Sequence, residues 1–335
     1  MSNYYTASKK TPSGARSHES RHSYLLLQFW GSLAFLFVFN LFPNTSLAAG
    51  LGKKKENPSQ TTSNPLILST TSLMGDLVEQ IAGPSFNFKT LMGPGVDPHI
   101  YKVKSHDLKH IRDASLVFFH GLHLEGQLYE KLKILSQKED KVINVGQQVQ
   151  KVKELIYADN VPDPHIWFSP QLWKNSAFFV ADALSQKHPD MAKNFLLNYK
   201  TFSEGIEKLE EWAKAEIEKI PNHKKVLITS HDAFRYLGRD FGIEVLGIQG
   251  ISTDAEASLG DIARIIKVIQ DKKIPSIFVE NSVSRATIEQ VQNKTGCKIG
   301  EELFSDALGG PESGANDYWS MFQHNIRSIV TGLSK

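Results

Sequence analysis

The chain has 335 residues, of which 41% are hydrophobic and 22% are charged, and its formal net charge is +2. This length exceeds the usual ~100–200 residues of a single domain, so two domains are expected. The composition is that of an ordinary globular protein, which argues against collagen-like, disordered and nucleic-acid-binding classes.

The first 49 residues are predicted to be a signal peptide. A basic leader precedes an apolar stretch at 24–42, and small residues follow at 46–50. This order suits cleavage after Ala48 or Ala49, and the polar residues before the cleavage point disfavour the alternative of a transmembrane anchor. The only cysteine is Cys297, so neither lipid attachment near the cleavage point nor an internal disulfide is expected. We expect a soluble mature protein in the periplasm or otherwise outside the cytoplasm.

Removing the leader brings basic and acidic residues close to balance, so the sequence indicates no anionic partner and no nucleic acid. Residues 50–64 are mostly polar and are predicted to be a flexible linker.

Apolar runs alternate with helical patterns through the rest of the chain. In the first half, strands are predicted at 65–71, 87–92, 115–119 and 141–145, with helices at 72–82, at 105–114 (capped by Ser105), and at 124–135. In the second half, strands are predicted at 226–229, 244–248, 276–279 and 298–303, with helices at 233–241, 259–272, 284–294 and 316–333. Such alternation is typical of parallel sheets built from βαβ units and predicts an α/β fold.

The two halves are separated by residues 189–220, which have helical apolar spacing and no internal proline. At ~1.5 Å per residue, one helix of this length spans a whole domain, although Gly205 weakens the pattern locally. We therefore expect an N-terminal lobe at 65–188, a connecting helix at 189–220 and a C-terminal lobe at 221–335.

A four-residue motif, Asp-Pro-His-Ile, occurs twice, with its histidines at His99 and His165. Each proline fixes its own φ and keeps the preceding aspartate extended, so each histidine leaves its turn in a defined direction. Asp97 and Asp163 are expected either to accept backbone hydrogen bonds in these turns or to orient the imidazoles.

Two further candidate ligands follow predicted strands of the second half. His231 comes directly after the strand at 226–229, and Asp306 follows the strand at 298–303. Ligands of open α/β sheets bind beyond the carboxyl ends of the strands, so these residues should meet His99 and His165 in one cleft between the lobes. Three imidazoles and one carboxylate form a four-ligand shell for a divalent transition metal.

Other polar residues near this cleft are open alternatives. His120 and His123 also follow a strand and could be metal ligands, although a lone histidine is more often a core or surface residue. Glu280 is expected to orient a ligand or to cap backbone groups.

Residues 65–335 resemble the TroA-like family (cluster A-I) of metal-specific solute-binding proteins, which supply zinc or manganese to ABC importers. The resemblance rests on the stretches GPGVDPHIY, GLHLE, DPHIWFSPQLW, TSHDAFRYLGRDFGIEVLGIQGISTDAEAS, IPSIFVENSV and GEELFSDALG. It implies two lobes joined by a long helix, with one metal buried between them on His99, His165, His231 and Asp306.

The chain departs from the family pattern in three places. Ser169 stands where many relatives have aspartate, and His120 replaces a frequent asparagine. The long loop rich in histidine and acidic residues that marks many zinc-dedicated relatives is absent.

The resemblance implies a monomeric substrate-binding component of an ABC importer, which carries Zn²⁺ or Mn²⁺ to a membrane permease and is not an enzyme. The alternatives are a surface adhesin of the same fold and a zinc-dependent hydrolase. The one HExxH match, His18–His22, lies within the predicted signal peptide, and the sequence has no GxGxxG motif. Manganese-dedicated relatives commonly have glutamate at the position of His231, so the three-nitrogen shell predicts tighter binding of zinc than of manganese.

Overall fold

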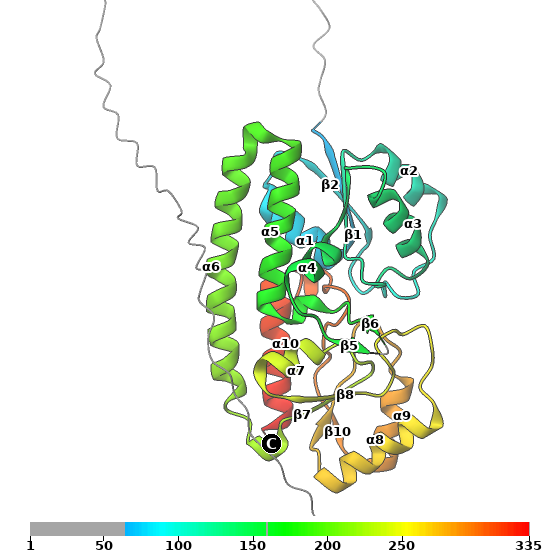
Figure 1. Ribbon diagram of the computed structural model, residues 1–335. Coiled ribbons are helices and arrows are strands. Elements are labelled where there is room, and N and C mark those ends of the chain that lie inside the picture. Colours follow the sequence, from blue (N-terminus) through cyan, green and yellow to red (C-terminus); the bar gives the residue numbers. More distant parts are fainter. Residues whose placement is uncertain (1–63, 159, 335) are drawn as a thin grey trace, which may run out of the picture. The chain divides into compact units, whose positions relative to one another are not determined.

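The computed structural model describes residues 64–158 and 160–334 (Figure 1). The predicted signal peptide, its cleavage point and the linker up to residue 63 lie outside the described residues. Among the described residues, no helix has the length and apolar character that crossing a membrane requires.

The first lobe is built on a four-stranded parallel sheet in the order β2-β1-β3-β4. Its strands are β1 (Leu66–Thr71), β2 (Asn87–Met92), β3 (Leu116–Phe119) and β4 (Val142–Asn144). The helices between and after them are α1 (Ser72–Ala82), α2 (Ser105–Asp113), α3 (Gly126–Ser136) and α4 (Val145–Val152). A two-stranded antiparallel hairpin follows, with β5 (Tyr157–Ala158) and β6 (Val161–Pro162).

The second lobe contains two short parallel pairs. One pair is β7 (Val226–Thr229) with β8 (Glu244–Gly247), and the other is β9 (Ser276–Ile277) with β10 (Lys298–Ile299). Single parallel bridges, Thr229 with Phe278 and Glu280 with Leu303, continue the pairing where the sequence predicts longer strands. The helices are α7 (Arg235–Phe241), α8 (Leu259–Lys272), α9 (Ala286–Thr295) and α10 (Tyr318–Leu333).

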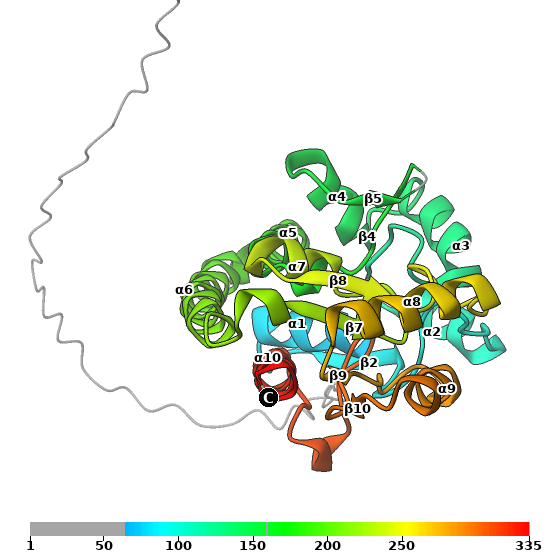
Figure 2. The same cartoon turned by 90° about the horizontal axis from the view of Figure 1, so that it is seen from below.

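Two long helices lie between the lobes in the sequence, α5 (Pro170–Lys187) and the 26-residue α6 (Ala192–Ile217). Figures 1 and 2 both show α5, α6 and α10 together along one side of the sheets. The expected connecting helix is thus confirmed, beginning after a 3-10 turn at Pro189–Met191. Ser169 caps α5, because its hydroxyl accepts the Leu172 N–H.

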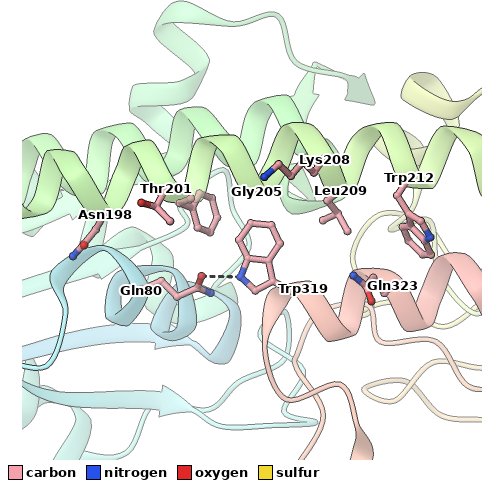
Figure 3. Close-up of a pocket in the computed structure, with 10 residues that line it drawn as sticks. Gln80, Asn198, Thr201, Gly205, Lys208, Leu209, Trp212, Trp319 and Gln323 are labelled. Carbon is pink, nitrogen blue, oxygen red and sulfur yellow. Dashed lines mark hydrogen bonds between the residues drawn. The ribbon is translucent and has the colours of Figure 1, made fainter.

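Gly205 does not interrupt α6, contrary to the weakening expected from the sequence. A Cβ at this position would lie 2.9 Å from Cη2 of Trp319 on α10, so glycine makes room for the indole ring between the two helices. Figure 3 shows Trp319 in this place, where its indole N–H donates to Gln80 of α1 at 2.8 Å.

The largest hydrophobic cluster is shared by both lobes. It runs from α1 through α5 and α6 to α10, and its most buried large side chains include Trp167, Trp173, Tyr236 and Phe322. The two-lobe α/β architecture is therefore held together by a common core along the long helices. The exact boundaries proposed for the lobes stay predictions.

Three local features differ from the sequence-based expectation. Lys104, not Ser105, is the N-cap of α2, because its N–H donates to Asp107 at 2.7 Å. Helix α4 was not predicted, and its sequence signal is Asn144, whose side chain accepts the Gln147 N–H. The β5–β6 hairpin was also missed, since two-residue strands leave no readable alternation.

Candidate metal centre

Loops at the carboxyl ends of strands carry the four candidate ligands. His99 lies in the loop after β2, and His231 directly follows β7. His165 precedes the 3-10 turn at Ile166–Phe168 that leads into α5, and Asp306 follows the bridge residue Leu303. As expected for an open α/β sheet, these ends face a common point between the lobes.

The four side chains converge closely, with one ligand atom of each lying within 4.8 Å of the others. His165 Nε2 lies 3.3 Å from His99 Nε2 and 3.3 Å from His231 Nε2. The two Asp306 oxygens approach from the other side, with Oδ1 3.3 Å from His165 Nε2 and Oδ2 3.3 Å from His231 Nε2. His99 Nε2 is farther from Oδ2, at 3.9 Å.

These separations match the shell of a small divalent ion. Ligands at 2.0–2.1 Å from a tetrahedral zinc lie about 3.3–3.4 Å apart. Four of these five distances are 3.3 Å, and all three histidines present Nε2. A tetrahedral ion therefore fits between the donors with little movement.

The environment of Asp306 favours a bound cation. Its carboxylate is fully buried, and neither oxygen has a hydrogen-bond partner within the described residues. A buried carboxylate without such partners is costly unless a positive charge compensates it. Because both oxygens face the centre, Asp306 can supply one or two donor atoms.

Carboxylates behind the histidines set their orientation. Asp163 Oδ1 lies 2.7 Å from His165 Nδ1 and also accepts the His165 N–H at 3.0 Å. Glu280 is the counterpart for His231: its Oε1 accepts the His231 N–H at 2.9 Å, and its Oε2 lies 2.5 Å from Nδ1. A carboxylate at Nδ1 places the proton there and leaves the Nε2 lone pair for a metal.

The two copies of the repeated motif are therefore used differently. Asp163 fills both roles expected from the sequence, since it braces its turn and orients the imidazole. Asp97 Oδ1 accepts the His99 N–H at 2.8 Å, while its Oδ2 accepts the Thr253 hydroxyl at 2.6 Å. Asp97 thus braces the turn and ties it to the second lobe.

Burial and charge shift the pKa values of the four groups in different directions. Burial lowers the pKa of His99 to about 3. Burial also disfavours charge on His165, but Asp163 and Asp306 outweigh it and raise the pKa of His165 to about 9. In the same way, Glu280 and Asp306 raise the pKa of His231 well above its ordinary value. Burial opposes ionisation of Asp306, yet His231 and His165 hold its pKa well below the usual range.

The other histidine candidates lie outside this four-residue cluster. His120 Nε2 is 2.8 Å from the Thr71 hydroxyl, and its ring stacks on Trp173 with 5.8 Å between centroids. His123 packs against the Tyr129 ring and lines a cavity next to His99.

Sequence reasoning missed the role of Glu125. This fully buried carboxylate accepts hydrogen bonds from the Thr70 hydroxyl and from the N–H groups of His120 and Gly121. It holds the loop after β3 in place, and the signal for it was the glutamate that ends the GLHLE stretch.

The sequence matches one known protein family over both lobes. Residues 67–332 match the family described as zinc-uptake complex component A, periplasmic (ZnuA). The chain belongs to this family. The match covers both lobes and contains all four candidate ligands.

Relatives of this chain carry metal-binding names. The manganese-binding lipoprotein MntA of Bacillus subtilis is 36% identical over 273 residues, which is 80% of this chain and 89% of the relative. The zinc-binding protein TroA of Treponema pallidum is 34% identical over 279 residues, covering 81% of this chain and 89% of the relative.

Solved structures agree on the fold. The periplasmic zinc-binding protein TroA of Treponema pallidum superimposes with a TM-score of 0.78 at 33% identity, covering 82% of this chain and all of that chain. Fe(III)-bound YtgA of Chlamydia trachomatis matches with a TM-score of 0.74 at 26% identity, over 80% of this chain and 98% of that one. The predicted α/β fold with two lobes and a long connecting helix is confirmed.

Proposed function

We propose that this protein is the extracytoplasmic substrate-binding component of an ABC importer, which captures a zinc or manganese ion and delivers it to a membrane permease. The observation that carries the proposal is the buried Asp306 carboxylate, which faces three imidazole Nε2 atoms and has no other polar partner within the described residues. Family membership and the metal-binding names of relatives point the same way.

We assign His99, His165, His231 and Asp306 as the metal ligands. The assignment rests on the 3.3 Å contacts between donors and on the Asp163 and Glu280 carboxylates at the far nitrogens of two imidazoles. Asp163, Glu280 and Asp306 place three carboxyl groups around the centre. This negative charge suits a divalent cation rather than an anion.

Zinc should bind more tightly than manganese in solution. Three nitrogens and one carboxylate oxygen suit tetrahedral zinc, and the general affinity order of divalent metals places manganese lowest. If both Asp306 oxygens coordinate, the shell gains a fifth donor and becomes more acceptable to manganese. The cargo in the cell then depends on which metal is available as well as on raw affinity.

Neither alternative function is favoured by the geometry. A catalytic zinc keeps a coordination position for water and needs a nearby base, whereas here four protein side chains close around the centre. An adhesin would not require a buried metal shell. We therefore propose that the protein transports metal and has no catalytic activity. We also propose that it acts as a monomer and does not bind nucleic acid.

Several relatives are named lipoproteins, but the only cysteine of this sequence is Cys297 in the second lobe. We propose instead that the leader is cleaved near Ala48 or Ala49 and that the mature protein is soluble outside the cytoplasm. Intact-mass measurement of the exported protein tests this, and a mass that retains residues 1–48 would contradict it.

Metal analysis of the protein, purified without added metal and then titrated in competition with a chelator, tests the proposed function. We expect one zinc or manganese ion per chain. The His165→Ala and Asp306→Ala variants should lose most of this affinity. His223→Ala replaces an exposed histidine of the 3-10 turn Asn222–Lys224, outside the four-residue cluster, and should bind as the unmodified protein does. Equal metal binding by all four proteins would contradict the ligand assignment.

A further inference from the structure

One of the four ligands differs from the others in its exposure. His165, His231 and Asp306 have no exposed surface, whereas 6% of His99 is exposed. His99 also lines a cavity of about 630 Å³, and none of the other three ligands does. An ion that moves between solvent and the centre therefore has its shortest path past His99.

This cavity has walls from both lobes. The first lobe contributes Ile100, Lys102 and His123, and the second lobe contributes Ser252 and Asp254. Ser252 and Asp254 belong to residues 251–257, here called the 251–257 loop, which contains bends but no helix or strand. The outer wall of the path is therefore a loop.

The 251–257 loop is attached to the second lobe at both ends, and at its far end Ala257 packs against a hydrophobic cluster of that lobe. Just before it, the Gln249 N–H donates to Ser230 O, and Gly250 O accepts the Asp232 N–H, so the loop starts from the rigid end of β7. All of its residues are half-buried or exposed. Within the described part of the chain, one hydrogen bond joins this loop to the first lobe, from the Thr253 hydroxyl to Asp97 Oδ2 at 2.6 Å.

This hydrogen bond reaches the metal centre through one residue. Asp97 accepts the Thr253 hydroxyl with Oδ2 and the His99 N–H with Oδ1. Other hydrogen bonds also join the lobes: the N–H groups of Tyr318 and Leu308 donate to Asp76 and Ser72, and the Gly95 N–H, in the loop that carries Asp97, donates to Leu308 O. The Thr253–Asp97 contact can therefore break without separating the lobes.

From this arrangement we infer that the 251–257 loop is the gate through which the metal is exchanged, and that the Thr253–Asp97 hydrogen bond holds it closed. The inference rests on the proposed metal-binding function. The contact joins two residues that are not among the proposed ligands, so it does not require a bound ion and is expected to hold the gate closed in the free protein as well as in the loaded one. Removing it should lower the barrier in both directions and leave the dissociation constant nearly unchanged.

Stopped-flow kinetics with zinc chloride test the gate, with association followed directly and dissociation followed after addition of excess chelator. Thr253→Val removes the hydroxyl and keeps the shape of the side chain. Both rate constants should rise about tenfold, the change expected when a hydrogen bond to a charged acceptor is lost, and the dissociation constant should stay within about threefold.

Two matched variants control for other effects. Thr253→Ser keeps the hydroxyl and should restore the unmodified rates. Thr201→Val makes the same substitution at an exposed threonine of α6, whose hydroxyl donates to Leu197 O within the helix, so its rates should not change.

Unchanged rate constants in Thr253→Val would contradict the proposed gate. Faster dissociation with unchanged association would contradict it too, because the hydrogen bond would then stabilise the metal-bound state and not a gate. Failure of the unmodified protein to bind zinc or manganese would instead contradict the proposed function itself.

Discussion

Glu280 offers the sharpest test of how the chain orients the proposed metal ligand His231. Its two carboxylate oxygens contact the N–H and Nδ1 of His231 at 2.9 and 2.5 Å, and both residues are almost completely buried. In Glu280→Gln, one oxygen can still accept the backbone N–H, but the amide NH₂ then faces Nδ1. The imidazole can accept from that NH₂ only by moving its proton to Nε2, the atom that should bind the metal.

The expected loss can be bounded. Replacing a carboxylate that orients a ligating histidine typically weakens metal binding 10–100-fold, which corresponds to about 1.4–2.7 kcal/mol. The upper part of this range is expected here, because the substitution both misplaces a proton and removes a negative charge close to the ion. Competition titration with a chelator at constant pH measures the change.

Glu289→Gln on α9 is a suitable control, since its carboxylate makes only an exposed ion pair with Arg285. This control should bind zinc as the unmodified protein does. A loss of less than threefold in Glu280→Gln would refute the view that Glu280 sets the proton position on His231.

Three further outcomes are expected. Because the proposed ligands come from both lobes, a metal at a hundredfold excess over its dissociation constant should stabilise the fold by about 2.7 kcal/mol, and an unchanged melting temperature on adding zinc or manganese to chelator-treated protein would contradict the site. His231→Glu should reduce the difference in affinity between zinc and manganese, and His231→Ala should weaken the binding of both metals. Displacement of equimolar zinc by manganese from the unmodified protein would refute the predicted preference for zinc. Burial raises the pKa of Asp76 to about 7, so this carboxyl favours folding at low pH and that contribution is lost as the pH rises towards 7. The free energy of unfolding of Asp76→Asn, relative to that of the unmodified metal-free protein, should therefore rise by up to about 4 kcal/mol between pH 4 and pH 8. Urea unfolding that gives the same difference between the two proteins at both pH values would contradict this.

Much of the fold could be predicted because its signals are local. Helix α1 begins and ends as predicted, since Thr71 caps its start by accepting the Met74 N–H and Gly83 follows its end with φ of 72°. The strand–helix alternation and the apolar spacing of α6 are equally local. Features that depend on packing were not predictable in this way, as Gly205 shows: its tolerance in α6 depends on a tryptophan more than a hundred residues later.

The candidate site also has features that local sequence predicts and features that depend on packing. The four proposed ligands could be selected because each sits in a short motif or directly after a strand. What the sequence could not decide was which carboxylate faces which nitrogen. Asp163 orients its own histidine two residues away, but Glu280 reaches His231 from the bridge after β9, 49 residues along the chain. The Thr253–Asp97 contact, across 156 residues, left no trace in either motif.

The most direct test of four-ligand metal binding is a crystal structure of the zinc-loaded protein with anomalous diffraction data collected on both sides of the zinc absorption edge. We predict a single zinc peak between the lobes, about 2.0–2.1 Å from Nε2 of His99, His165 and His231 and bound by one or both Asp306 oxygens. A zinc peak coordinated by other residues, or the absence of a peak between these four side chains in the loaded crystal, would contradict the assignment.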